Sequence, residues 1–166
     1  MTVTDVRTAE LTLEPEAPFD AITVDRLVAD AFGPGRWAKT AERLREGSLP
    51  VAGWVARHSG RAVGTVRLWP ILIGATPALF LGPIAVDASE RRSGLGARLV
   101  EAAVAWAGER DQGILLVGDT PYFGRFGFEQ ANEVRLPGPV DRRRVLWRGA
   151  VQPSGSVRAA PPDAAN

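Results

Sequence analysis

Two arginines and two glycines lie within one six-residue stretch, Arg91-Arg92-Ser93-Gly94-Leu95-Gly96. An apolar run at 79–86 precedes it and predicts a buried strand, and apolar residues spaced by three and four follow it and predict a helix over 94–110. The first N–H groups of a helix have no partners within the helix and carry the positive end of its dipole. A glycine-containing turn at that position favours a diphosphate ligand. A tight strand-to-helix turn without a ligand explains the same glycines.

The wider pattern distinguishes these interpretations. The spacing Arg91-x-x-Gly94-x-Gly96, directly after a strand that ends at Val86, resembles the acetyl-CoA motif of the GNAT superfamily of N-acetyltransferases. A second segment, 118–128, is similar to the strand-helix-Gly-Phe segment of that superfamily, and most like its YhbS-like branch. The resemblance implies acetyl-CoA as cosubstrate, and it assigns cofactor binding to Ile84, Ala85, Val86, Arg91, Arg92, Ser93, Gly94, Leu95 and Gly96.

The resemblance also implies direct acetyl transfer to an amine, without a covalent enzyme intermediate. Pro83 has no N–H to donate, so it predicts a bulge in the strand 78–86. In the family this strand splays from its parallel neighbour, and the pantetheine arm occupies the gap. An N–H near Ile84 would then face the thioester oxygen, a role worth on the order of 10²–10³ in rate for each donor.

An acid and a base would complete this chemistry. Family members often place a tyrosine acid four residues before the glycine of Gly-Phe, but that position is Phe123 here. Tyr122, roughly 100° away around a helix, is the candidate acid, with surface packing as the other interpretation. Asp119, after a predicted parallel strand, is the candidate base, with helix capping as the other interpretation. Glu42 and Glu90 are weaker candidates for the base.

Composition excludes several other functions. A net charge of +1 gives no electrostatic case for nucleic acid or an anionic membrane. No stretch reaches the ~18 apolar residues of a membrane span, and no signal peptide is visible, so we expect a cytoplasmic location. The chain has no cysteine, and His58 is its one histidine, so neither a thiolate–metal site nor a two-histidine site can form. We therefore expect no metal.

The order of elements predicts an α/β (α+β) fold with a mostly antiparallel sheet, one parallel strand pair and about four helices. The resemblance implies that the sheet is GNAT-like and that its parallel pair is splayed. The strand-helix-strand unit at 78–117 predicts the parallel pair, and Thr120 is the predicted N-cap of a short helix. The expected domain covers 1–151, and a flexible tail covers 152–166. Expected helices cover 20–32, 37–46, 94–110 and 120–126, and expected strands cover 11–14, 51–58, 62–73, 78–86, 114–117 and 145–151.

Two sets of side chains have two interpretations each. Phe32, Trp37 and Trp69 could line an acceptor pocket, but aromatic core packing explains them equally well. The basic run 142–144 is expected to be a solvated surface rather than a binding patch.

Three functions stay open at this point. The favoured one is an acetyltransferase that acts on a primary amine of a small molecule. The second is a CoA-binding sensor or partner protein without catalysis, which the Phe123 position keeps open. The third is a protein acetyltransferase acting on lysine or an N-terminus. A dinucleotide site is disfavoured because Leu99 stands where Gly-x-Gly-x-x-Gly needs its third glycine. The family resemblance also suggests a homodimer.

Overall fold

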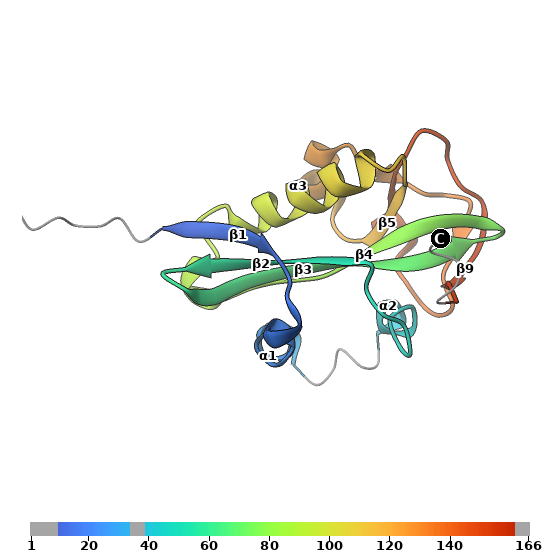
Figure 1. The fold of residues 1–166 in the computed structure, drawn as a ribbon. Coiled ribbons are helices and arrows are strands. Elements are labelled where there is room, and N and C mark those ends of the chain that lie inside the picture. Colours follow the sequence, from blue (N-terminus) through green and yellow to red (C-terminus); the bar gives the residue numbers. More distant parts are fainter. Residues whose placement is uncertain (1–9, 34–38, 162–166) are drawn as a thin grey trace, which may run out of the picture.

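The computed structural model describes residues 10–33 and 39–161, and Figure 1 shows their arrangement around one sheet. Helix α3 covers one face of the sheet, and α1 and α2 lie on the other (Figure 1). The described strands are β1 (Leu11–Pro15), β2 (Ala52–His58), β3 (Arg61–Ile73), β4 (Thr76–Val86), β5 (Ile114–Val117), β6 (Glu129–Gln130), β7 (Val134–Arg135), β8 (Val145–Arg148) and β9 (Gly155–Ala159). The helices are α1 (Ala21–Phe32), α2 (Thr40–Arg43), α3 (Leu95–Gly108) and α4 (Thr120–Phe123).

The sheet order is β1-β2-β3-β4-β5-β8-β6, with β9 pairing to β3 and to β7. Strands β2, β3 and β4 form an antiparallel meander with short turns, and β1 pairs antiparallel with β2. The two faces of the sheet are covered by different helices. The α3 face is covered by Leu95, Leu99, Val100, Ala103 and Ala107, and the opposite face by Val24, Leu27 and Val28 of α1. The helical spacing of these apolar residues is what allows each helix to bury one side.

The predicted bulge in β4 is confirmed. Pairing between β3 and β4 shifts register between Val66 and Leu68, at the point where Gly82 and Pro83 lie on the opposite strand. Gly82 has φ +135°, a conformation that favours glycine, and its peptide bond to Pro83 is cis. Pairing with β3 resumes at Ile84, so the strand continues beyond the bulge.

The parallel pair is also confirmed, and it is short. Strands β4 and β5 pair only at Leu79–Ile114 and Phe80–Leu115. Beyond these pairs, β4 stays paired with β3 while β5 pairs antiparallel with β8. The carboxyl halves of β4 and β5 are therefore separated from each other, and the bulge at 82–83 lies where the separation begins.

Two details of the helices differ from the sequence predictions. Helix α2 spans Thr40–Arg43, which is shorter than the predicted 37–46, and Trp37 lies outside the described residues. The N-cap of α4 is Asp119, with extended backbone angles, and not Thr120 as predicted. Among the described residues, no helix combines the length and the apolar character that crossing a membrane requires.

The prediction of a flexible tail at 152–166 is wrong for residues 155–159, which form β9. Strand β2 stops pairing with β3 at Leu68, which leaves the edge of Ile71–Ile73 without a partner from β2. Strand β9 pairs along that edge and buries Val157. A segment rich in small and polar residues is thus ordered by hydrogen bonds to an edge that is distant in sequence, and its own composition carries no sign of this.

The burial of β9 predicts a contrast between two valines. Val157 is 3% exposed and Val151 is 78% exposed. Val157→Ala should lower the free energy of unfolding by about 1–3 kcal/mol, because it removes buried methyl groups. Val151→Ala, the matched control, should change it by less than about 0.5 kcal/mol. Urea unfolding measures both changes. A Val157→Ala variant as stable as the Val151→Ala variant would show that β9 does not hold its place in solution.

Candidate functional site

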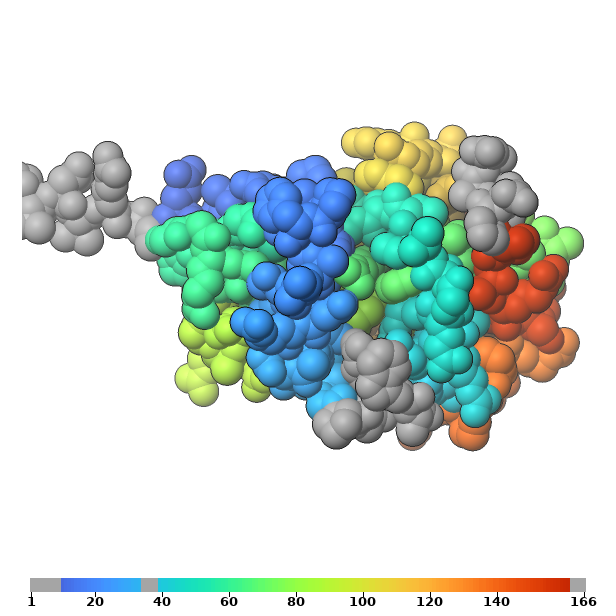
Figure 2. Space-filling view, turned by 60° about the horizontal axis from the view of Figure 1, so that its bottom comes forward, coloured from blue at the N-terminus to red at the C-terminus, as the bar shows by residue number. Residues whose placement is uncertain are grey.

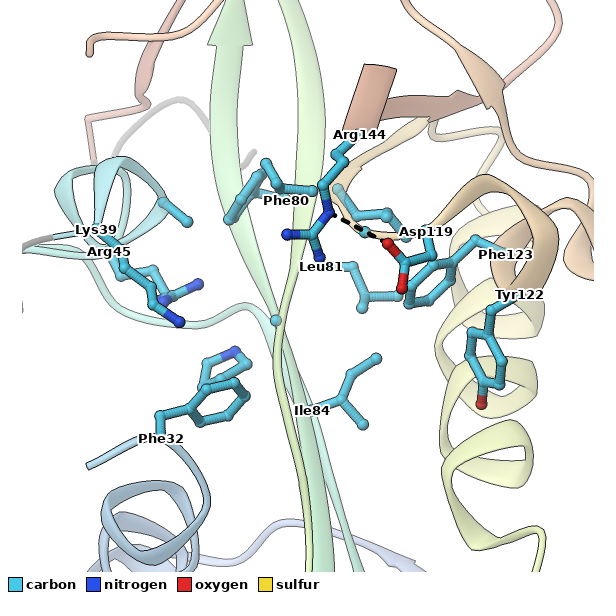
Figure 3. A pocket seen from close by; sticks show the side chains of 16 residues that line it. Phe32, Lys39, Arg45, Phe80, Leu81, Ile84, Asp119, Tyr122, Phe123 and Arg144 are labelled. Atoms are coloured by element: carbon cyan, nitrogen blue, oxygen red, sulfur yellow. Dashed lines mark ion pairs between the residues drawn. The ribbon is translucent and has the colours of Figure 1, made fainter. Parts of the chain in front are cut away.

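A cavity of about 320 Å³ lies where β4 and β5 separate (Figure 3). Its walls come from five parts of the fold, several of which are far apart in sequence. Strand β4 contributes 80–84, the end of β5 and the residues after it contribute 116–119, and α4 contributes Tyr122 and Phe123. The α1–α2 side contributes Phe32, Lys39, Ala41 and Arg45, and the last wall residue is Arg144.

The cavity opens toward the face that carries α1 and α2. Figure 2 shows this face, where green atoms of the strands are visible in a depression between α1 (blue) and α2 (cyan). Ile84 pairs with β3, and within the described ladders β4 and β5 share no pair beyond Phe80. The edge of β4 that faces β5 is therefore open to a ligand at the level of Ile84.

Contacts on the α1 face of the sheet support the bulge. The Trp69 indole N–H donates a hydrogen bond to the carbonyl oxygen of Gly82. Arg67, opposite the bulge, donates two hydrogen bonds to Glu16, at 2.6 and 3.0 Å, and lies 3.8 Å from Asp25. The hydrogen bonds to Glu16 raise the pKa of Arg67. Trp69 is thus a buried packing residue rather than an acceptor contact, whereas Phe32 does line the cavity.

The turn before α3 is exposed and has no side-chain cap. Residues 91–94 are all exposed, and no side chain caps the helix at Gly94, which has φ +77°. The Asp87 carboxylate accepts hydrogen bonds from the Ser89 amide at 3.0 Å and the Ser89 hydroxyl at 2.7 Å. These bonds lower the pKa of Asp87. Asp87 thus orders the chain between β4 and this turn, a role that the sequence reasoning missed.

Tyr122 points toward the turn before α3. Its hydroxyl oxygen lies 3.3 Å from the point where a Cβ on Gly96 would be, and Figure 3 shows the ring directed away from Asp119. The Phe123 ring packs against Gly118, where an added Cβ would lie 2.3 Å from it, and against Phe128. The position that the sequence resemblance gives to an acid is therefore filled by a packed phenyl ring.

The three carboxylates considered as a base are in different environments. Asp119 lines the cavity and forms an ion pair with Arg144 at 3.3 Å. It occupies the N-cap position of α4 without a side-chain capping bond, so the capping interpretation is wrong. Glu42 is buried and pairs with Arg45 at 2.8 Å. Glu90 contacts His58 at 2.6 Å. Of the three, only Asp119 is among the residues that line the cavity.

Three cations of the cavity wall were not found from the sequence. Lys39 and Arg45 flank α2, and Arg144 belongs to the run that was expected to be a solvated surface. Arg144 is half exposed, yet its side chain reaches the cavity wall. No local pattern identifies these residues, because the fold brings them together from separate segments.

Comparison with known proteins gives a consistent result. Residues 22–128 match the family described as Acetyltransferase (GNAT) family. The chain is 32% identical over 120 residues to "Uncharacterized N-acetyltransferase YhbS" of Escherichia coli K12, covering 70% of this chain and 72% of that protein. The crystal structure of E. coli YhbS in complex with CoA is similar, with a TM-score of 0.78, 25% identity and coverage of 92% and 91% of the two chains.

A second solved structure agrees in fold. It is a GNAT family acetyltransferase from Brucella melitensis in complex with acetyl-CoA. The TM-score is 0.72 at 22% identity, with coverage of 92% of this chain and 97% of that one.

The left-handed conformation of Gly94, the N-cap of α3, predicts a contrast with Gly108, the last residue of that helix. A Cβ would meet no atom within 4 Å at either Gly94 or Gly108, so only backbone conformation separates them. Gly94→Ala should lower the free energy of unfolding by about 1–2 kcal/mol. Gly108→Ala should raise it by about 0.5–1 kcal/mol, because alanine is the better helix former. Thermal or urea unfolding measures both, and a neutral Gly94→Ala would contradict the conformation of this turn.

Proposed function

Because the chain belongs to the acetyltransferase (GNAT) family, we propose that it transfers an acetyl group from acetyl-CoA directly to a primary amine of a small molecule. One observation carries the proposal: an exposed, uncapped helix start and an open strand edge lie on the same side of the bulge in β4. The CoA complex of the E. coli relative supports acetyl-CoA as the cosubstrate. The cytoplasmic location and the homodimer stay predictions.

The cosubstrate would lie between α3 and the separated strands. Residues 91–96 would hold the diphosphate through backbone N–H groups and the two arginine side chains. Ile84, Ala85 and Val86 would present backbone groups to the pantetheine arm along the edge of β4 that β5 leaves open. This places the thioester beside the bulge, at the floor of the cavity.

The reaction then needs no covalent enzyme intermediate. The neutral amine attacks the thioester carbon, and the carbonyl oxygen becomes an oxyanion that the N–H near Ile84 would stabilise. The C–S bond breaks as the C=O bond re-forms, and coenzyme A leaves as the thiolate. The amine nitrogen loses its proton to Asp119, directly or through water, because Asp119 is the carboxylate on the cavity wall.

Coenzyme A can leave without much help from a general acid. A thiol has a pKa of about 8.5, so coenzyme A can depart as thiolate near neutral pH. Phe123 offers no hydroxyl, and the Tyr122 hydroxyl lies beside Gly96 rather than beside Asp119. We therefore assign Tyr122 mainly to contact with the cosubstrate, with proton donation to the thiolate as a lesser role.

The packed phenyl ring of Phe123, which has no hydroxyl to donate a proton, also favours a second candidate function. A protein that binds acetyl-CoA but lacks an efficient acid could act as a CoA sensor. The two candidates differ in one measurable property, which is the release of free thiol in the presence of amines.

Acetyl-CoA binding is the first test. Acetyl-CoA at a hundred times its Kd should raise the free energy of unfolding by about 2.7 kcal/mol, which a thermal shift detects. Arg92→Gln should weaken binding about tenfold or more in calorimetry, because it removes a charge-assisted hydrogen bond to phosphate.

Arg110→Gln is the matched control for that variant. Arg110 is exposed just beyond the other end of α3 and packs over Trp106, so it should bind acetyl-CoA like the unaltered protein. Absence of any shift with acetyl-CoA would refute both candidate functions. Binding without thiol release across a broad amine panel would leave only the sensor.

Tyr122→Phe tests the assignment of the acid. The variant should lower kcat by less than about a hundredfold, because the thiolate can leave unaided and acid catalysis typically contributes 10²–10⁴. Steady-state thiol release gives kcat, and calorimetry gives the affinity for acetyl-CoA. A larger loss of kcat with unchanged affinity would show that Tyr122 is the acid.

A further inference from the structure

The wall of the cavity that faces α2 is rich in positive charge. Lys39, Arg45 and Arg144 all line the cavity, and Asp119 is the one carboxylate among the residues that line it. In Figure 3 the Arg45 and Arg144 side chains extend from opposite sides toward the middle of the cavity, above Ile84. Three cations and one carboxylate thus line the cavity that an acceptor would enter, and a second carboxylate, Glu42, pairs with Arg45.

Each of these cations contacts a neighbouring side chain. Arg45 donates to the buried Glu42 at 2.8 Å, and its Nη1 lies 3.5 Å from the point where a Cβ on Gly82 would be. The Lys39 ammonium lies 5.5 Å from the centroid of the Phe32 ring. These contacts place Arg45 beside the bulge and the exposed Lys39 beside Phe32.

Arg144 forms an exposed ion pair with Asp119. The ion pair engages its Nε atom, and a guanidinium has further N–H donors beyond Nε. Asp141, which lines the neighbouring cavity together with Lys39 and Arg144, is hydrogen-bonded by Arg143 at 3.0 Å and 3.2 Å. Asp141 is therefore already engaged by another arginine.

The cosubstrate does not account for these cations. Residues 91–96, where its phosphates would bind, are not among the residues that line the cavity. The part of acetyl-CoA that would enter the cavity is the thioester, which is uncharged. A simple amine does not account for them either, because cations repel an ammonium group.

We infer that the acceptor carries an anionic group, a carboxylate or a phosphate monoester, beside its reacting amine, and that Lys39, Arg45 and Arg144 bind that group. This inference rests on the proposed function. The anion would be held by guanidinium groups that suit planar oxyanions. The same cations would lower the pKa of the acceptor's ammonium group, which increases the fraction present as neutral nucleophile.

The experiment compares pairs of acceptors that differ in the anion alone. Phenylalanine is paired with phenethylamine, lysine with cadaverine, and glucosamine 6-phosphate with glucosamine. Calorimetry on the protein loaded with CoA measures binding, and thiol release from acetyl-CoA measures turnover. We expect the anionic member of at least one pair to bind at least tenfold more tightly and to have the higher kcat/KM. The amino acid and sugar phosphate pairs distinguish carboxylate from phosphate.

Two variants test the residues. Arg144→Gln and Lys39→Met should each reduce the ratio of kcat/KM between the paired acceptors about tenfold, through a higher KM for the anionic member. Loss of a base would instead lower kcat/KM for both members of a pair equally, and the ratio would stay unchanged. Arg158→Gln, on the exposed side of β9, is the matched control and should not alter the ratio.

The outcomes separate the inference from the proposed function. Turnover without preference for the anionic members, or a preference that both variants retain, overturns the inference alone. Tighter binding of anionic amines without any turnover supports the inference and overturns acetyl transfer. Failure of every anionic amine to bind the CoA-loaded protein overturns the inference, whatever the turnover.

Discussion

The site depends on one constraint in the backbone of β4. Pro83 has no N–H, so the strand cannot keep regular pairing through this position, and the bulge with Gly82 results. The parallel ladder with β5 ends three residues before Pro83, at Phe80. The central sheet is thereby opened in its middle rather than at an edge, and its polar backbone groups become available to a ligand. A buried sheet otherwise pairs almost all of these groups within the protein.

The opening is maintained because the surrounding structure holds the bulge from the α1 face. The Trp69 indole donates to the Gly82 carbonyl, and Arg67 is anchored by Glu16. The Arg67–Glu16 pair is largely buried, and buried pairs are costly to break because removal of one partner leaves an uncompensated charge. The bulge is thus a supported feature with a defined geometry. The open edge beside it can therefore be regarded as preorganised for a ligand.

The two faces of the sheet serve the two substrates of the proposed reaction. The exposed helix start belongs to α3 on one face, and the depression between α1 and α2 opens on the other (Figures 1 and 2). The opening between β4 and β5 connects them. Positively charged residues lie on both sides. Arg91 and Arg92 lie at the start of α3, whereas Lys39 and Arg45 lie beside α2. The acetyl group would pass from one side to the other at the bulge.

Several structural features of this protein follow from local sequence alone. Glycine and arginine spacing at 91–96, apolar periodicity in α3 and the proline at 83 predicted the turn, the parallel pair and the bulge, because each depends on neighbouring residues. Only the tertiary structure decided that β9 completes the sheet beside Ile71–Ile73, that Asp119 pairs with Arg144, and that Tyr122 points toward Gly96. Lys39, Arg45 and Arg144 likewise meet through the fold alone. Their contacts join segments up to about a hundred residues apart, and such contacts depend on packing geometry that no local pattern encodes.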